Sequence, residues 1–182
     1  MLQEQTGRLS HLAEILLDMT GVQTVERSER ISLAALTDEV FCDLDPVAEK
    51  AGISIHFDDS SSQDWHTDVH TPDASALNNN IRNITGSYVL LYRAVYNLVE
   101  NAIKYNRPGG RVTVHTGRQD DRVVLAVSDT GIGMNENFLQ RLYMPFEQAD
   151  SMISQRFGGT GLGMSITKNL VSLLGGTIQV FS

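Results

Sequence analysis

The sequence has a single cysteine, an excess of acidic over basic residues and no long apolar run. One cysteine cannot form an internal disulfide, and Cys42 lies in an apolar-periodic stretch, which predicts a buried thiol in a reducing compartment. With 14 Lys and Arg against 22 Asp and Glu, the formal net charge is −8. No basic stripe is available to neutralise phosphates, so we expect no nucleic-acid binding. No apolar run approaches the roughly 18 residues of a membrane span, and we expect a cytoplasmic domain. Membrane anchoring of a parent protein stays open.

A length of 182 residues suits one domain with a real core and one appended helix. Within residues 2–19, apolar residues recur seven and three positions apart. This spacing predicts a short helix whose apolar stripe packs on another helix. A cap at Ser32 and a stop at Gly52 predict a second helix. The apolar positions of this helix are Leu36, Val40, Phe41, Leu44 and Val47.

The remaining pattern alternates strands and helices. We expect a strand over 53–57, a long polar surface loop over 58–83, a helix over 88–106 and a hairpin of strands 111–117 and 122–129. A short helix over 135–142 is followed by a polar stretch, up to Gly159, that has the composition of a mobile lid. A last helix starts at Gly161-Leu162-Gly163, is closed by Gly175 and Gly176, and leads to a strand over 177–181.

Three segments carry the chemistry, and the first lies on the helix over 88–106. At 100° per residue, Asn97, Asn101 and Lys104 share one stripe, with Glu100 and Tyr105 at its edges. Asparagines are poor helix formers, so two on one stripe need a reason. An asparagine side-chain oxygen is a hard ligand that suits Mg²⁺, and a lysine can pair with a phosphate.

The second and third segments are rich in glycine. Asp129 ends a strand and precedes a turn containing Gly131 and Gly133. Its carboxylate only accepts hydrogen bonds, which favours the exocyclic amine of adenine over the carbonyl of guanine. Residues Thr160, Gly161, Leu162 and Gly163 open a helix, whose unpaired N–H groups form an anion site. A flexible turn remains the plain alternative for this loop taken alone. The three segments together predict an ATP pocket.

These three segments and residues 145–150 resemble the four conserved motifs, called boxes, of the catalytic ATP-binding domain of sensor histidine kinases. That domain shares the Bergerat fold with DNA gyrase. Residues 97–105 resemble its N box, 129–133 its G1 box, 145–150 its F box and 159–163 its G2 box. The F box is similar to that of hybrid kinases. The resemblance implies an α+β fold, a two-layer α/β sandwich with a mixed sheet and helices on one face. Residues 31–182 would form this domain, and 1–30 part of the dimerisation helix and a linker.

The resemblance also implies roles for individual residues. Asn97 and Asn101 would bind phosphate and Mg²⁺, with Asn101 as the metal ligand, and Lys104 would bind phosphate. Tyr105 and Asp129 would bind adenine, and Gly131 and Gly133 would allow its close approach. Thr160, Gly161, Leu162 and Gly163 would cradle phosphates. Arg156 either reaches the γ-phosphate or faces solvent. Glu100 aligns with the water-activating base of gyrase-like relatives, so the expected catalytic set is Glu100, Asn101 and Lys104.

The acceptor-histidine motif of the family is absent from this sequence. We therefore expect the acceptor upstream of this fragment and the final strand of the domain downstream. The implied partners are the dimerisation and phosphoacceptor helices of the same protein and a response regulator receiver domain, with a homodimeric parent. Two alternatives stay open: a nucleotide-sensing module without kinase activity, and a gyrase-like ATPase that uses Glu100.

Overall fold

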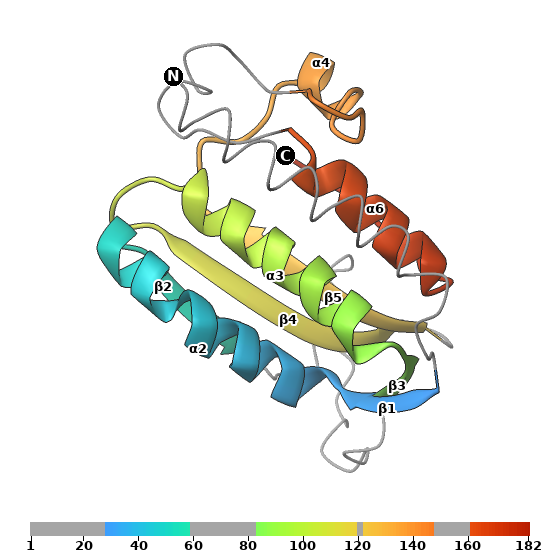
Figure 1. The fold of residues 1–182 in the computed structure, drawn as a ribbon. Coiled ribbons are helices and arrows are strands. Elements are labelled where there is room, and N and C mark those ends of the chain that lie inside the picture. Colours follow the sequence, from blue (N-terminus) through green and yellow to red (C-terminus); the bar gives the residue numbers. More distant parts are fainter. Residues whose placement is uncertain (1–27, 59–82, 120–121, 148–160) are drawn as a thin grey trace, which may run out of the picture.

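The computed structural model describes residues 28–58, 83–119, 122–147 and 161–182. The predicted helix over 2–19, most of the polar loop, the lid and the residues Arg156 and Thr160 lie outside these ranges. The described elements follow the chain as shown in Figure 1. They are β1 (Glu29–Ser32), α2 (Leu33–Ala51), β2 (Ser54–Asp58), β3 (Asn83–Gly86), α3 (Tyr88–Lys104), β4 (Arg111–Gln119), β5 (Arg122–Asp129), α4 (Glu136–Leu139) and α6 (Gly163–Leu173).

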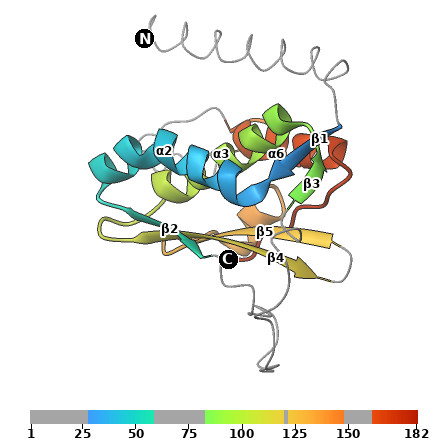
Figure 2. The same ribbon diagram turned by 90° about the horizontal axis from the view of Figure 1, so that it is seen from below.

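The architecture has two layers, as expected from the resemblance. Strands β2, β4 and β5 form a mixed sheet in which β2 and β4 are parallel and β4 and β5 antiparallel. Helices α2, α3 and α6 lie together on one face of this sheet (Figure 2). Strands β1 and β3 form a separate antiparallel pair at one end of the helices. The predicted mixed sheet with helices on one face is confirmed.

Helix α2 begins and ends where the sequence predicts. The hydroxyl of Ser32 accepts the Ala35 N–H at 3.4 Å, and Gly52 takes the left-handed conformation, with φ of 69°, that ends the helix. Its buried stripe repeats every four residues and consists of Leu36, Val40, Leu44 and Ala48. Val47 lies off this stripe and is 45% exposed.

The prediction of a buried Cys42 is wrong, because this thiol is exposed. Cys42 lies two residues from both Val40 and Leu44, on the opposite side of α2 from their buried stripe. An apolar-periodic stretch does not bury every residue within it. The position of a residue within the period decides its burial.

Helix α3 is central and packs on both neighbouring helices. Val95, Val99 and Ile103 belong to the main core with α2 and the sheet. Leu90 and Ala94 instead pack against Leu170 of α6 in a second, smaller cluster. Because α3 is buried on two sides, its polar residues are left along narrow stripes at the edges of these contacts.

The strand predicted over 177–181 is not formed. The segment keeps the predicted alternation, with Ile178 and Val180 half-buried and Thr177, Gln179 and Phe181 exposed, but it has no ladder with a neighbouring strand. Alternation reports which side chains face the protein, whereas a strand also needs a backbone partner. The pairing of β1 with β3 was not predicted, because each strand is only four residues long.

Candidate nucleotide site

The two asparagines of the predicted stripe face the start of α6. The Asn97 Nδ2 group lies 3.5 Å from the Thr167 Oγ1 atom, and that hydroxyl donates to the Gly163 carbonyl at 2.9 Å. One turn further along α3, a Cβ atom built on Gly163 would lie 3.6 Å from the Asn101 Nδ2 atom. The structure therefore brings together Asn97, Asn101 and Gly163, which are up to 66 residues apart in sequence.

The start of α6 presents backbone donors at this same place. Leu162 is the residue before the first helical turn, and no side chain caps the helix there. The N–H groups of a first turn have no partner inside their own helix and attract anions. Asparagine amides and this helix terminus together form a polar end of the site, which we call the phosphate end.

Gly161 fits tightly under the residues of the F box. Its φ is 71°, and a Cβ atom would lie 2.7 Å from the Glu147 carbonyl oxygen and from the Phe146 carbonyl carbon. The Phe146 N–H donates to the Gly161 carbonyl at 3.0 Å. Phe146 itself has a positive φ of 66°, and the Arg141 guanidinium pairs with the Glu147 carboxylate at 2.8 Å. Only glycine can occupy position 161 without moving this backbone.

The other end of the site lies where α3 and β5 finish, and we call it the adenine end. The Asp129 Oδ1 atom accepts the Gly131 N–H at 2.8 Å. A Cβ atom on Gly131 would lie 2.6 Å from the Tyr105 carbonyl oxygen, and the Ile132 N–H donates to this oxygen at 3.1 Å. Gly133 has a φ of 70°. The structure thus places Tyr105 and Asp129, both predicted adenine ligands, beside one turn.

Lys104 and Glu100 line a recess of about 480 Å³ together with the C-terminal end of α2 and the loop after α3. Burial lowers the pKa of the Lys104 ammonium, and the negative charge of Glu100 opposes this shift. The Lys104 Nζ atom lies 5.3 Å from the centre of the Tyr105 ring. Burial also raises the pKa of the Tyr105 phenol.

Three residues that connect the site were not predicted from the sequence. They are Asn106, Thr130 and Thr167. Thr167 bonds to Asn97 of the N box and to Gly163 of the G2 box, and Asn106, directly after the N box, accepts a hydrogen bond from Thr130 of the G1 box. Asn106 directly follows the N box, and Thr130 lies inside the G1 box between the predicted Asp129 and Gly131. A polar residue next to a motif is the signal that could have found them.

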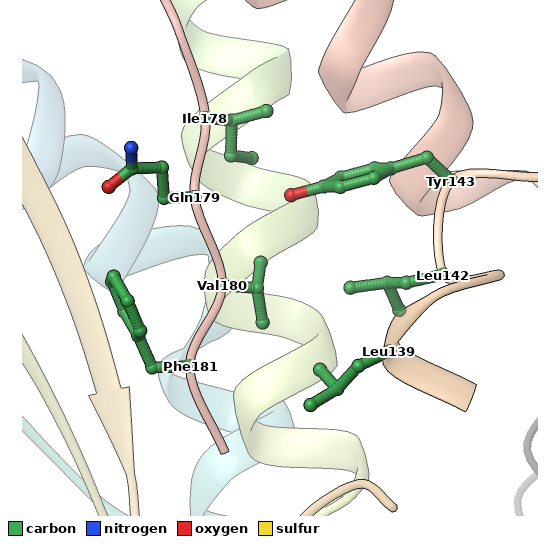
Figure 3. A pocket seen from close by; sticks show the side chains of 7 residues that line it. All are labelled: Leu139, Leu142, Tyr143, Ile178, Gln179, Val180 and Phe181. Atoms are coloured by element: carbon green, nitrogen blue, oxygen red, sulfur yellow. The ribbon is translucent and has the colours of Figure 1, made fainter. Parts of the chain in front are cut away.

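A second recess, shown in Figure 3, lies outside this site. It measures about 310 Å³ and is lined by Leu139, Leu142, Tyr143 and residues 178–181. Ile178 and Val180 point into it, whereas Gln179 and Phe181 point away. The lining is mainly apolar, and burial raises the pKa of the Tyr143 phenol. Such a recess offers no group suited to phosphate or metal.

The described residues contain no helix long and apolar enough to cross a membrane. They also contain no group of three or more His, Cys, Asp or Glu side chains that could hold a metal ion. Asn101, the predicted metal ligand, lies at the phosphate end and carries an amide oxygen.

Comparison with known proteins gives a family and a set of relatives. Residues 86–182 match the family model described as histidine kinase-, DNA gyrase B- and HSP90-like ATPase. The chain is 42% identical over 106 residues to the circadian input-output histidine kinase CikA of Synechococcus elongatus, covering 58% of this chain and 14% of CikA. It is 31% identical over 178 residues to the sensor-like histidine kinase SenX3 of Mycobacterium tuberculosis, covering 98% of this chain and 40% of SenX3.

Solved structures share the fold. The histidine kinase AdeS of Acinetobacter baumannii superposes with a TM-score of 0.68 at 20% identity, over 98% of this chain and 74% of that one. The histidine kinase ThkA, in complex with the response regulator protein TrrA, superposes with a TM-score of 0.62 at 19% identity, over 94% of this chain and 43% of that one. The chain spans less than half the length of the curated relatives given above.

Proposed function

This chain belongs to the histidine kinase-, DNA gyrase B- and HSP90-like ATPase family and is a sensor histidine kinase catalytic domain, and we propose that it holds Mg-ATP between α3, β5 and α6. In the longer protein it would donate the γ-phosphoryl group to a histidine of the dimerisation helices. The observation that carries this proposal is the meeting of Asn97, Asn101 and the uncapped start of α6.

The adenine end supplies base recognition. One Asp129 oxygen is already bonded to the Gly131 N–H, which leaves its other oxygen to accept from the exocyclic amine of adenine. Guanine carries a carbonyl oxygen at the same place, and two acceptors would repel. Tyr105 offers an aromatic ring for stacking, and Gly131 and Gly133 leave room for the base. We therefore propose ATP, and not GTP, as the nucleotide.

The phosphate end supplies charge neutralisation. The N–H groups of Gly161, Leu162 and Gly163 would bind phosphate oxygens. Asn101 would hold Mg²⁺ by its side-chain oxygen, and Asn97 would bind the phosphates beside it. The residues fit this ion, since an amide oxygen is a hard, neutral donor and the remaining ligands come from phosphates and water. The ion would neutralise charge that develops on the transferring group. Lys104, Arg156 and Thr160 complete the proposed phosphate contacts.

The work of the protein in phosphoryl transfer is positioning and electrostatic stabilisation. The acceptor histidine and the receiving response regulator are proposed partners of the longer protein, which we expect to be a homodimer. A response regulator is the partner in the ThkA complex. Within this chain, we propose residues 31–182 as the catalytic domain and 1–30 as helix and linker.

The direct test mixes this chain with a separately produced domain that carries the acceptor helices, in the presence of γ-labelled ATP and Mg²⁺. The proposal predicts label on a histidine that is lost in acid and stable in base. Two other outcomes would contradict it. Nucleotide binding without transfer would favour a sensing module. Release of free phosphate that is lost in Glu100→Gln would favour a gyrase-like ATPase.

A further inference from the structure

We propose that Asn106 and Thr130 form a clamp that positions the Asp129 carboxylate and thereby sets the preference for adenine over guanine. This inference rests on the proposed function and adds two positioning residues to it. Both lie next to predicted adenine ligands in sequence, since Asn106 follows Tyr105 and Thr130 follows Asp129.

Asn106 is the centre of the clamp and is only 6% exposed. Its Oδ1 atom accepts the Arg107 N–H at 2.9 Å and the Thr130 hydroxyl at 3.2 Å. Its Nδ2 group donates to the Arg111 carbonyl at 3.0 Å. The amide has one possible orientation, because turning it over would set a donor against the Arg107 N–H and an acceptor against the Arg111 carbonyl.

Thr130 joins the turn after β5 to the same centre. Its Oγ1 atom accepts the Arg111 N–H at 2.9 Å, so its single proton is free to point at the Asn106 Oδ1 atom. The Thr130 N–H also donates to the Arg111 carbonyl at 3.1 Å. The end of α3, the start of β4 and the end of β5 are therefore tied together by two side chains.

Gly110 shows that the space around the clamp is full. A Cβ atom at this position would lie 2.2 Å from the Asn106 Oδ1 atom and 2.8 Å from the Thr130 Oγ1 atom. Real Cβ atoms do not approach oxygen this closely, so position 110 is glycine to admit both polar side chains. The local sequence around the clamp is matched to its geometry.

The clamp acts on the base through the turn that it fixes. Thr130 lies between Asp129 and Gly131, and the Asp129 carboxylate bonds back to the Gly131 N–H at 2.8 Å. Loosening Thr130 shifts both residues relative to Tyr105, whose carbonyl holds the next N–H of the turn. Hydrogen-bond recognition tolerates displacements of well under about 1 Å, so base selectivity falls before phosphate binding does.

The test compares Thr130→Val with Thr130→Ser in this chain by calorimetric titration with ATP and GTP, each with Mg²⁺. Removing the hydroxyl should lower the ratio of ATP to GTP affinity about five- to tenfold, the size of one lost hydrogen bond, whereas serine should keep the ratio. Thr116→Val is the matched control. It also removes a threonine hydroxyl, but this one is buried in β4 without a hydrogen-bond partner among the described residues.

Asn106→Ser is the second variant, since serine is too short to reach the Arg111 carbonyl and Thr130 together. Asn106→Ser should lower the ratio of ATP to GTP affinity. A variant that only lowers the melting temperature would leave this ratio unchanged. An unchanged ratio in both Thr130→Val and Asn106→Ser would overturn the clamp. If the unmodified chain binds neither nucleotide, the proposed function itself fails, and the two failures are thereby distinguished.

Discussion

The adenine end and the phosphate end of the site are built differently. At the adenine end, side chains of Asn106, Thr130 and Asp129 make hydrogen bonds of 2.8 to 3.2 Å that join three elements. At the phosphate end, among the described residues, Asn97 and Thr167 make a long side-chain hydrogen bond of 3.5 Å between α3 and α6, and the start of α6 has no side-chain cap.

This difference follows from the ligands that each end is proposed to hold. A base is recognised by direction, because donors and acceptors must meet at fixed angles, and fixed side chains serve that purpose. A triphosphate with its cation is recognised by charge, which falls off slowly with distance. Backbone N–H groups and amides that adjust on binding serve this second purpose. The following changes should separate the two ends.

Asp129→Ala should have the largest effect. It removes the acceptor for the adenine amine, and a hydrogen bond to a charged group accounts for roughly 10- to 100-fold in affinity. ATP affinity measured by calorimetry should fall by at least this factor. Asp38→Ala removes an exposed carboxylate from α2 and serves as the control. Equal ATP affinity in the two variants would remove Asp129 from the site.

Asn101→Ala should break the phosphate end and leave the adenine end intact. The variant loses an oxygen ligand for Mg²⁺, so the gain in ATP affinity on adding Mg²⁺ should shrink about tenfold. Affinity measured in excess chelator should match that of the unmodified chain. A variant that keeps the full Mg²⁺ effect would show that the cation is held elsewhere.

Gly161→Ala and Gly175→Ala form a matched pair with φ of 71° and 76°. Alanine in this conformation costs about 1 to 2 kcal/mol of stability at either position. At 161 the new Cβ would also meet the backbone of Phe146 and Glu147, whereas nothing lies within 4 Å at 175. ATP affinity should therefore fall several-fold in Gly161→Ala alone. Melting curves and titrations of both variants measure this difference, and similar ATP affinities would refute it.

Thr167→Val should have a smaller effect on the same end. Thr167 is fully buried, and its proton points to the Gly163 carbonyl, so the Asn97 amide must turn its Nδ2 group toward it. Valine frees that amide, and Mg-ATP affinity should fall about three- to fivefold. Ser172→Ala removes a similar hydroxyl bond to the Lys168 carbonyl, far along α6, and should leave affinity unchanged. Similar affinities in both would exclude the orienting role.

Tyr88 lies outside the site and should make a contribution to stability that depends on pH. Its hydrogen bond to Glu39, followed by burial, raises the pKa of the phenol from 10.0 to about 12. Because the folded pKa lies above the unfolded one, the neutral phenol stabilises the fold below pH 10, and this contribution is lost between pH 10 and about 12. Relative to the unmodified chain, Tyr88→Phe should flatten the fall in melting temperature over this window without changing ATP affinity. An unchanged slope would contradict the shift.

Local signals explain what could be predicted from the sequence. Ser32 and Gly52 bound α2 because capping depends on a few neighbouring residues. The boxes marked Asn97, Asn101, Asp129 and the residues before α6. The structure brings Asn97 and Asn101 to the start of α6, and Asp129 lies beside the turn that contacts Tyr105.

Other features depend on contacts between distant segments and could not be read locally. The β1–β3 pair joins strands 50 residues apart or more, and the segment 177–181 alternates like a strand without forming one. The recess that Lys104 lines is completed by residues of α2, and the clamp of Asn106 and Thr130 appears only when α3, β4 and β5 come together.

Parallel calorimetric titrations of the unmodified chain with Mg-ATP and Mg-GTP test the account most directly. A rigid adenine end predicts saturable binding of ATP and at least tenfold weaker binding of GTP, with an ATP affinity that drops when Mg²⁺ is chelated. Equal affinity for the two nucleotides, or binding of neither, would contradict the account.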